Sequence, residues 1–445
     1  MRIHFIAIGG SAMHNLALAL HDQGHIITGS DDEIYEPSRT RLDKAGLLPK
    51  TYGWYIEKIE PKIDAIILGM HAHIDNPELL RAQKLNIPIY SYPEFVAKQS
   101  KNKRRVVIAG SHGKTTTTSI IMHALSFANV DYDYLVGAQL KGFDRMVRLS
   151  DSDLIILEGD EYLSSPIDRR PKMMHYNPDI AVITGIAWDH INVFPTLENY
   201  ENQFQCFVSN MAHDSCLFYY SKDEAMVKII NNEEHNCKTV SYNKVEVDKN
   251  KNIVDNNKSY LLNLIGNHNL QNIKAAQLVC NEIGVSNDIF FNSLSTFAGA
   301  SKRLQILKKS SSGNGNVYLD FAHAPSKVKA TTQAVKDWYP DAPLLAVFEL
   351  HTYSSLNKDF LPQYKNTLAA ADIVIIYFSK HALEMKRMPM LNRAYIKKCF
   401  DHLNIIVVDN NQEFKNLLAS HKKNKNNTLF MTSGTFDGID LNKEI

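Results

Sequence analysis

The sequence lacks several features that would assign a protein to a class at once. Its five cysteines are scattered without Cys-x-x-Cys spacing, so they give neither a disulfide framework nor a zinc signature. No apolar run approaches the roughly 18 residues that cross a bilayer, and the short one before Gly9 is not typical of a secretory signal. The formal net charge is only +1, which does not indicate a nucleic-acid partner. We therefore expect a soluble, cytoplasmic protein with free thiols and no membrane or nucleic-acid partner; its oligomeric state stays open.

The composition and the pattern of apolar runs predict an α/β protein. Hydrophobic residues make up 44% of the chain and charged residues 22%, as in globular proteins. Short apolar runs alternate with helical patterns from end to end, which is typical of parallel sheets. A chain of 445 residues exceeds a single core. We predict three domains, over residues 1–98, 99–298 and 299–445.

Each predicted domain contains several expected strands. The first has "RIHFIAI", "HIITGSD" and "DAIILGM", with a helix over 11–23; the second has "RVVIAG", "DLIILEGDE" and "IAVITGIAWDH", with helices over 114–128 and "NHNLQNIKAAQLVCNEIG". The third has "NVYLDFA", "LLAVFEL", "ADIVIIYF", "NIIVVD" and "TLFMTSG". The polar stretch "NKVEVDKNKNIVDNNKS" predicts a hairpin or a loop.

The stretch "AGSHGKTTTT", residues 109–118, resembles a phosphate-binding loop. It matches the end of the pattern G-x-x-x-x-G-K-[ST], although Ile108 stands where the first glycine belongs. A strand, a glycine turn and a helix start are all present, and the N–H groups and dipole of a helix start favour anions. Lys114 would then contact the β- and γ-phosphates, and Thr115 would hold Mg²⁺. The alternative is an ordinary helix start with a solvated lysine. The expected phosphate contacts are Gly110, Ser111, His112, Gly113, Lys114, Thr115 and Thr116.

Acidic residues follow two expected strands of the second domain. Glu158 ends one apolar run, and Asp189 and His190 follow another. Ligands of open α/β sheets bind at the carboxyl ends of parallel strands, and Mg²⁺ prefers oxygen donors. We therefore expect Thr115, Glu158 and His190 to hold the metal. The alternative is that the acids cap loops and that His190 is a surface residue.

The first expected strand leads into a turn with the spacing of a dinucleotide fingerprint. Ala7, Gly9 and Ala12 occupy the three glycine positions, and Asp31 follows Gly9 by 22 residues, where an acid grips ribose hydroxyls. The same turn suits any diphosphate, so a dinucleotide, a sugar nucleotide and a purely structural turn all stay open.

Together these motifs resemble the Mur ligase family, the ATP-dependent amide-bond ligases of peptidoglycan assembly. The resemblance rests on "GSHGKTTTT", "EGDEY", "WDH", "GNHNLQNIKAA", "SKRLQ", "LDFAHAPSK" and "MTSGTFDGI", which span nearly the whole chain. It implies a Rossmann-like UDP-binding domain, a central P-loop ATPase domain and a C-terminal domain with a dinucleotide-binding-like fold. It also implies ATP and Mg²⁺ as cofactors and UDP-N-acetylmuramate with a peptide or amino acid as substrates.

The resemblance assigns roles to individual residues. Lys114, Glu158 and His190 would be catalytic. Asn269, Asn272, Arg303 and Asp320 would join the loop in binding ATP. The UDP-sugar contacts would be Gly9, Gly10, Ser11, Ala12, Met13, Ser30, Asp31 and His71.

Within the family, "EGDEYLSSPIDRRPKMMHYNP" is more similar to the branch that attaches the recycled tripeptide L-Ala-γ-D-Glu-meso-diaminopimelate to UDP-N-acetylmuramate. The alternative is the branch that attaches L-alanine in de novo synthesis. The chain departs from the family in the segment "HTYSSLN", which follows "LAVFEL". Family members usually carry an arginine in this segment, whereas this chain has none there and begins the segment with His351. A nucleotide-binding protein without ligase activity and an NAD-dependent dehydrogenase are two further alternatives.

Overall fold

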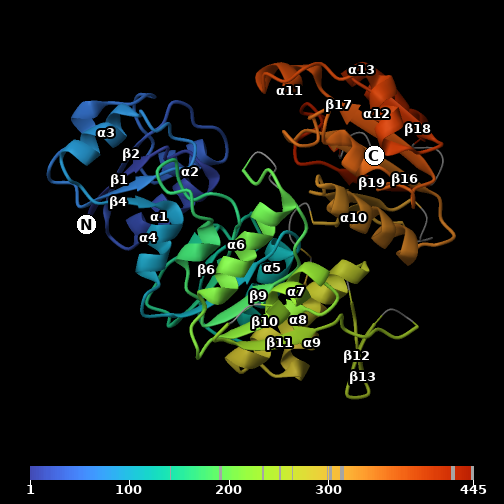
Figure 1. Ribbon diagram of the computed structural model, residues 1–445, viewed down its shortest axis with the longest axis horizontal. Coiled ribbons are helices and arrows are strands. Elements are labelled where there is room, and N and C mark those ends of the chain that lie inside the picture. Colours follow the sequence, from blue (N-terminus) through green and yellow to red (C-terminus); the bar gives the residue numbers. More distant parts are fainter. Residues whose placement is uncertain are drawn as a thin grey trace. The chain divides into compact units, whose positions relative to one another are not determined.

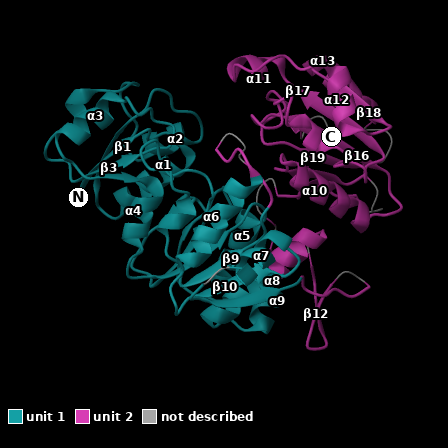
Figure 2. Cartoon of the chain, in the orientation of Figure 1, with its two compact units in different colours: residues 1–186, 197–243, 274–293 teal, residues 187–196, 244–273, 294–445 magenta. Residues whose placement is uncertain are grey.

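The computed structural model forms two compact units, which Figure 2 colours separately. The structure describes residues 1–140, 142–189, 193–232, 235–249, 252–262, 264–297, 299, 303–310, 315–421 and 426–441. Unit 1 comprises residues 1–186, 197–243 and 274–293. Unit 2 comprises residues 187–196, 244–273 and 294–445.

Unit 1 begins with a four-stranded parallel sheet in the order β2-β1-β3-β4 (Figure 1). Its strands are β1 (Arg2–Ile6), β2 (Ile26–Ser30), β3 (Ala65–Leu68) and β4 (Ile89–Ser91). Its helices are α1 (Ser11–Asp22), α2 (Ser38–Lys44), α3 (Pro77–Lys84) and α4 (Tyr92–Gln99), with the 3-10 turn η1 (Ile56–Lys58). Local sequence fixes where two of the helices start. Asn76 accepts the N–H groups of Glu78 and Leu79 at the start of α3, and Ser91 and Glu94 form a capping box at the start of α4.

The second sheet of unit 1 has seven strands in the order β11-β10-β9-β5-β8-β6-β7, and only the edge strand β7 is antiparallel. The strands are β5 (Arg104–Ala109), β6 (Asp133–Leu135), β7 (Val147–Arg148), β8 (Leu154–Glu158), β9 (Ile180–Ile183), β10 (Cys216–Tyr220) and β11 (Lys238–Tyr242). The helices are α5 (Lys114–Phe127), α6 (Leu197–Ser209), α7 (Glu224–Asn232) and α9 (Asn287–Leu294), with η2 (Lys172–His175). Helix α8 (Asn267–Ile283) has its first residues in unit 2 and the rest in unit 1.

Unit 2 contains a six-stranded sheet in the order β14-β15-β19-β16-β17-β18, parallel except for the edge strand β14. Its strands are β14 (Gln305–Lys308), β15 (Val317–Asp320), β16 (Leu344–Leu350), β17 (Ile373–Phe378), β18 (Ile405–Val408) and β19 (Asn427–Met431). Its helices are α10 (Pro325–Trp338), α11 (Lys380–Met385), α12 (Arg393–Phe400) and α13 (Asn411–His421), with η3 (Leu361–Tyr364). Apolar clusters lie on both faces of this sheet, because alternate residues of β16 belong to different clusters.

The sequence predicted strands β1, β2, β3, β5, β8, β9 and β15 to β19. It did not predict the sheet strands β4, β6, β7, β10, β11 and β14. Strand β9 ends at Ile183, well before Asp189, because Gly185 takes a φ of 140° that interrupts an extended strand. The antiparallel strand β14 precedes β15, which is the first strand expected in this part of the chain. The polar insertion forms the predicted hairpin, with β12 (Ile253–Asp255) paired to β13 (Lys258–Tyr260). Among the described residues, no helix is both long and apolar enough to cross a membrane.

Candidate active site

The phosphate-loop candidate lies in the middle of the seven-stranded sheet. It joins β5 to α5, and β5 lies between β8 and β9. The strand register pairs Ile108 with Glu158, so the end of β8 lies beside the start of the loop. Helix α5 begins after Gly113, whose φ of 85° lies in the left-handed region, and in the described part of the chain no side chain caps this helix start. The first N–H groups of an α-helix have no partner within the helix, which makes a helix start of this kind a favourable place for an anion.

Gly110 allows the loop to pass close to the neighbouring strand. Its φ is 118°, and a Cβ at this position would lie 2.3 Å from Oγ1 and 2.8 Å from the backbone nitrogen of Thr184. Ser111 N–H donates to the carbonyl of Gly185 at 2.9 Å, which holds the loop against the end of β9. Only glycine fits Gly110 without displacing this backbone.

The ammonium of Lys114 lies inside the loop. Its Nζ donates to the carbonyl of Gly110 at 2.6 Å and forms an ion pair with Glu161, whose side chain is only 1% exposed. Burial by itself would lower the pKa of Lys114, but neighbouring carboxylates, above all that of Glu161, outweigh it and raise the pKa. Lys114 is therefore a fixed cation at the helix start.

Thr115 and Glu158 meet beside this lysine. Thr115 Oγ1 donates to Glu158 Oε1 at 2.8 Å, and Gly137 N–H donates to Glu158 Oε2 at 2.8 Å. A hydroxyl and a carboxylate are the hard oxygen donors that Mg²⁺ prefers, so this pair fits the metal. The third predicted ligand, His190, lies outside the described residues. No group of three or more His, Cys, Asp or Glu side chains that could hold a metal occurs among the described residues.

A buried tyrosine joins the loop to Glu161. The hydroxyl of Tyr200, on α6, lies 2.7 Å from Ser111 Oγ and donates to Glu161 Oε1 at 3.2 Å. Tyr200 is fully buried, and Ser111 is 3% exposed. The sequence analysis predicted neither contact: Glu161 was not among the expected site residues, and Tyr200 lies 89 residues from Ser111 with no local motif.

The glycine turn of the first sheet is braced by Asp31. Gly9 N–H donates to Asp31 Oδ2 at 2.6 Å, and Asp32 N–H donates to Asp31 Oδ1 at 3.0 Å. Burial raises the pKa of Asp31 to about 6. Ser30 is buried and its hydroxyl accepts from Lys58 Nζ at 2.9 Å. The sugar-nucleotide contacts stay predictions; what the geometry adds is that Asp31 holds the turn in place.

The other predicted residues of this turn differ in exposure. Ser11 is exposed at the start of α1, Gly9, Gly10 and Ala12 are half-buried, and Met13 is buried. His71 is exposed in the loop after β3, where a ligand could reach it. Asn76, in the same loop, caps the start of α3.

In unit 2, the two predicted asparagines lie one turn apart on α8. Asn269 Nδ2 donates to the carbonyl of Ile265 at 2.8 Å, and Asn272 Nδ2 lies 3.4 Å from Asn269 Oδ1. Both side chains are largely buried. Their contact with adenine stays a prediction.

Asp320 anchors the backbone beside Arg303. Its Oδ1 accepts from Leu304 N–H at 3.2 Å and its Oδ2 from Thr331 Oγ1 at 2.5 Å. The guanidinium of Arg303 lies 4.8 Å from the centre of the Phe321 ring. Asp320 therefore holds the backbone at Leu304, the residue directly after Arg303.

His323 and Asp189 also belong to unit 2. Burial, followed by the charge of Lys327, lowers the pKa of His323 to about 4. Lys327 Nζ lies 3.6 Å from Asp189 Oδ2. Asp189 thus has a cationic partner on α10.

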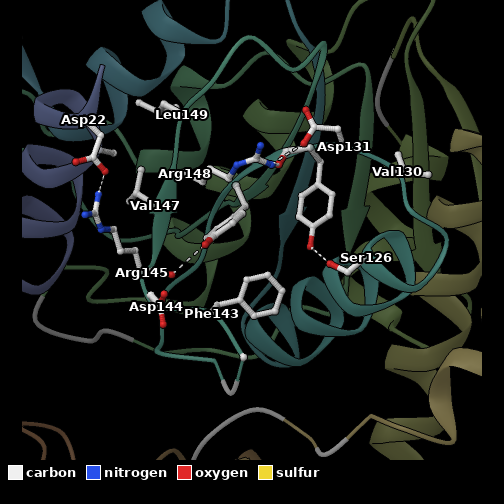
Figure 3. A pocket seen from close by; sticks show the side chains of 14 residues that line it. Asp22, Ser126, Val130, Asp131, Phe143, Asp144, Arg145, Val147, Arg148 and Leu149 are labelled. Atoms are coloured by element: carbon white, nitrogen blue, oxygen red, sulfur yellow. Dashed lines mark hydrogen bonds and ion pairs between the residues drawn. The ribbon is translucent and has the colours of Figure 1, made fainter. Parts of the chain in front are cut away.

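A cavity of about 630 Å³ lies elsewhere in unit 1, beside α1, the end of α5 and strands β6 and β7 (Figure 3). Figure 3 shows Arg145 directed at Asp22 and Arg148 at Asp131. The residues that line this cavity are Ala19, Asp22, Ser126, Val130, Asp131, Tyr132, Tyr134, Gly142, Phe143, Asp144, Arg145, Val147, Arg148 and Leu149. This lining contains none of the predicted site residues.

Comparison with known proteins places the chain in one family. The Mur ligase middle domain matches residues 108–280, and the catalytic domain of the Mur ligase family matches residues 2–104. The chain is 32% identical to the UDP-N-acetylmuramate–L-alanine ligase of Clostridium botulinum (strain Okra / Type B1), over 84% of this chain and 82% of the relative. It is 29% identical to the enzyme of the same name from Ruthia magnifica subsp. Calyptogena magnifica, over 97% of this chain and 94% of the relative.

Solved structures share the fold. The UDP-N-acetylmuramate–alanine ligase of Thermotoga maritima superposes with a TM-score of 0.71 at 21% identity, covering 98% of this chain and 97% of that one. A murein peptide ligase from Psychrobacter arcticus 273-4 superposes with a TM-score of 0.67 at 22% identity, covering 99% and 97%.

These matches show that the chain belongs to the Mur ligase family. Its parallel sheets are consistent with this assignment. The chain is an ATP-dependent, ADP-forming ligase of peptidoglycan synthesis with the α/β architecture of that family.

Proposed function

We propose that this ligase uses ATP to activate the lactyl carboxylate of UDP-N-acetylmuramate and then joins it to an amine. The observation that carries the proposal is the start of α5, where the cation of Lys114 lies next to the oxygen pair of Thr115 and Glu158. This arrangement suits phosphoryl transfer, in which catalysis consists mostly of positioning and of stabilising charge.

The reaction has two steps. A carboxylate oxygen of the sugar nucleotide attacks the γ-phosphorus, and the bond to the ADP oxygen breaks. The amine nitrogen then attacks the acyl carbon, the phosphate leaves, and the nitrogen loses a proton. Lys114 neutralises charge on the phosphates in the first step, and the N–H groups at the start of α5 orient them.

Thr115 and Glu158 would hold Mg²⁺, with His190 as the third proposed ligand. The bound ion would supply further charge neutralisation on the phosphate oxygens. The turn at Gly9, braced by Asp31, is proposed to receive the pyrophosphate of the sugar nucleotide.

For the amine, we propose L-alanine. The curated relatives that cover most of the chain are named UDP-N-acetylmuramate–L-alanine ligases, which favours L-alanine over the tripeptide expected from the sequence. The tripeptide is the second candidate, supported by the segment 158–178 that follows β8.

A kinetic comparison tests both parts. Purified protein is incubated with MgATP, UDP-N-acetylmuramate and either L-alanine or the tripeptide, and ADP and phosphate are measured. We expect release that requires both the sugar nucleotide and the amine, with a larger kcat/KM for L-alanine. Release that does not depend on the sugar nucleotide would refute the ligase proposal, and a larger kcat/KM for the tripeptide would reverse the choice of amine.

A further inference from the structure

The network around Lys114 has a member outside the loop and outside the expected metal ligands. The hydroxyl of Tyr200 contacts both Ser111 and Glu161, and all three residues are almost completely buried. Helix α6 contributes this side chain, and the ring packs edge-on against Phe204 at 5.4 Å between ring centres.

The directions of these hydrogen bonds follow from the donors available. A phenol has one proton and an ionised carboxylate only accepts, so Tyr200 donates to Glu161 and accepts from Ser111. Glu161 therefore accepts from the hydroxyl of Tyr200 and from the ammonium of Lys114. Hydrogen bonds to a charged group are the strong ones, and each donor shares in compensating the buried charge.

A phosphate that binds at the start of α5 competes with Glu161 for Lys114. When the ammonium turns to the phosphate, Glu161 loses part of its compensation, while the hydroxyl of Tyr200 still donates to it. We propose that Tyr200 is a positioning residue that lowers the cost of transferring Lys114 from Glu161 to ATP. This role rests on the proposed function, because it assumes that the nucleotide phosphates bind at this loop.

The test uses the full-length enzyme with the Tyr200→Phe variant, which keeps the ring and removes only the hydroxyl. Tyr132→Phe is the matched control, because Tyr132 is also buried, and its hydroxyl donates to the carbonyl of Met122 at the other end of α5. Titration calorimetry with Mg²⁺ and a non-hydrolysable ATP analogue measures nucleotide binding without ligation.

For Tyr200→Phe we expect the Kd of the analogue and the KM for ATP to rise roughly tenfold, with kcat and the KM for the sugar nucleotide within about twofold. Tyr132→Phe should leave all four unchanged. In a Glu161→Gln background the effect of Tyr200→Phe should fall below about twofold, because the competing charge is gone. A change spread equally over kcat and every KM would indicate a purely structural role and would overturn the proposal. An unchanged Kd of the analogue would overturn it too, because Tyr200 would then have no effect on nucleotide binding.

Glu161→Gln alone gives a second measurement that does not need the tyrosine variant to fold. Because Lys114 is no longer held by a carboxylate, the Kd of the analogue should fall at least threefold; an unchanged or larger Kd would overturn the inference. If the wild-type enzyme binds no analogue at all, the phosphate site itself is refuted. If it binds the analogue and the tyrosine has no effect, only the role of Tyr200 is refuted.

Discussion

Replacing Lys114 by methionine tests two roles of its ammonium, one in the stability of the fold and one in ligation. The variant keeps most of the aliphatic stem but leaves Glu161, 1% exposed, without its cation. Breaking a buried ion pair by removing one partner costs about 3–5 kcal/mol, and since Tyr200 still donates to Glu161 we expect the lower end, about 3 kcal/mol. Ligation should fall by at least about 10²-fold, the effect of removing one preorganised charge-stabilising group.

The double variant Lys114→Met/Glu161→Gln sharpens this prediction. Removing both charges should restore the free energy of unfolding to within about 1 kcal/mol of the wild type, but it should not restore ligation. Urea unfolding followed by circular dichroism gives the first quantity, and ADP release gives the second.

Lys103→Met is the control for a loss of stability alone. Lys103 Nζ pairs with Asp133 at 2.9 Å, and the two side chains are 11% and 0% exposed, similar to Lys114 and Glu161. This variant should lose comparable stability while its KM for ATP stays unchanged. The reasoning would be refuted if Lys114→Met kept ligation within tenfold of the wild type, or if Lys103→Met weakened ATP binding as strongly.

Three further predictions follow from single contacts. Thr115→Val removes the hydroxyl that donates to Glu158 and should raise the Mg²⁺ concentration for half-maximal activity about tenfold. Thr115→Ser keeps a hydroxyl and should need the same Mg²⁺ concentration as the wild type. Equal Mg²⁺ requirements of Thr115→Val and the wild type would contradict the metal assignment. Gly110→Ala should lower the free energy of unfolding by more than about 2 kcal/mol, because φ is 118° and the backbone of Thr184 is close. Gly24→Ala is the control, since φ is 83° and no atom lies near the added Cβ; it should cost only about 1 kcal/mol. Urea unfolding measures both. His323 has its pKa lowered from 6.5 to about 4, so its stabilising contribution is complete above pH 6.5 and is lost as the pH falls toward 4. Between pH 7 and pH 5 this loss is about 2 kcal/mol; His323→Gln should flatten that dependence in urea unfolding and the exposed His381→Gln should not.

The strands that the sequence predicted are mostly short, nearly continuous apolar runs. Strands β5 and β16 are examples, since their inner residues are buried whichever way they point. Strand β9 was predicted too long because the residues after it are also apolar, and a single glycine with positive φ ends it. Strand β14 was not predicted, because its burial alternates and half of it faces solvent.

The candidate site could be predicted only where neighbours in sequence are also neighbours in space. The loop Gly110–Thr115 is one segment, and Glu158 is the last residue of the apolar strand β8, at the carboxyl end where ligands of open α/β sheets bind. The structure brings Thr115 and Glu158 within hydrogen-bond distance. By contrast, the contact of Tyr200 with Ser111 depends on how α6 packs, and no local pattern encodes that. The backbone hydrogen bonds that Asp31 and Asp320 accept were likewise not predictable where they join residues that are distant in the sequence.

The central claim is that the start of α5 holds the phosphates of ATP. Its most direct test is a crystal structure of this enzyme with Mg²⁺ and a non-hydrolysable ATP analogue. We predict the β- and γ-phosphates within hydrogen-bond distance of Lys114 Nζ and of the N–H groups of Gly113–Thr115. A triphosphate bound at another place, with Lys114 still paired to Glu161, would contradict the account.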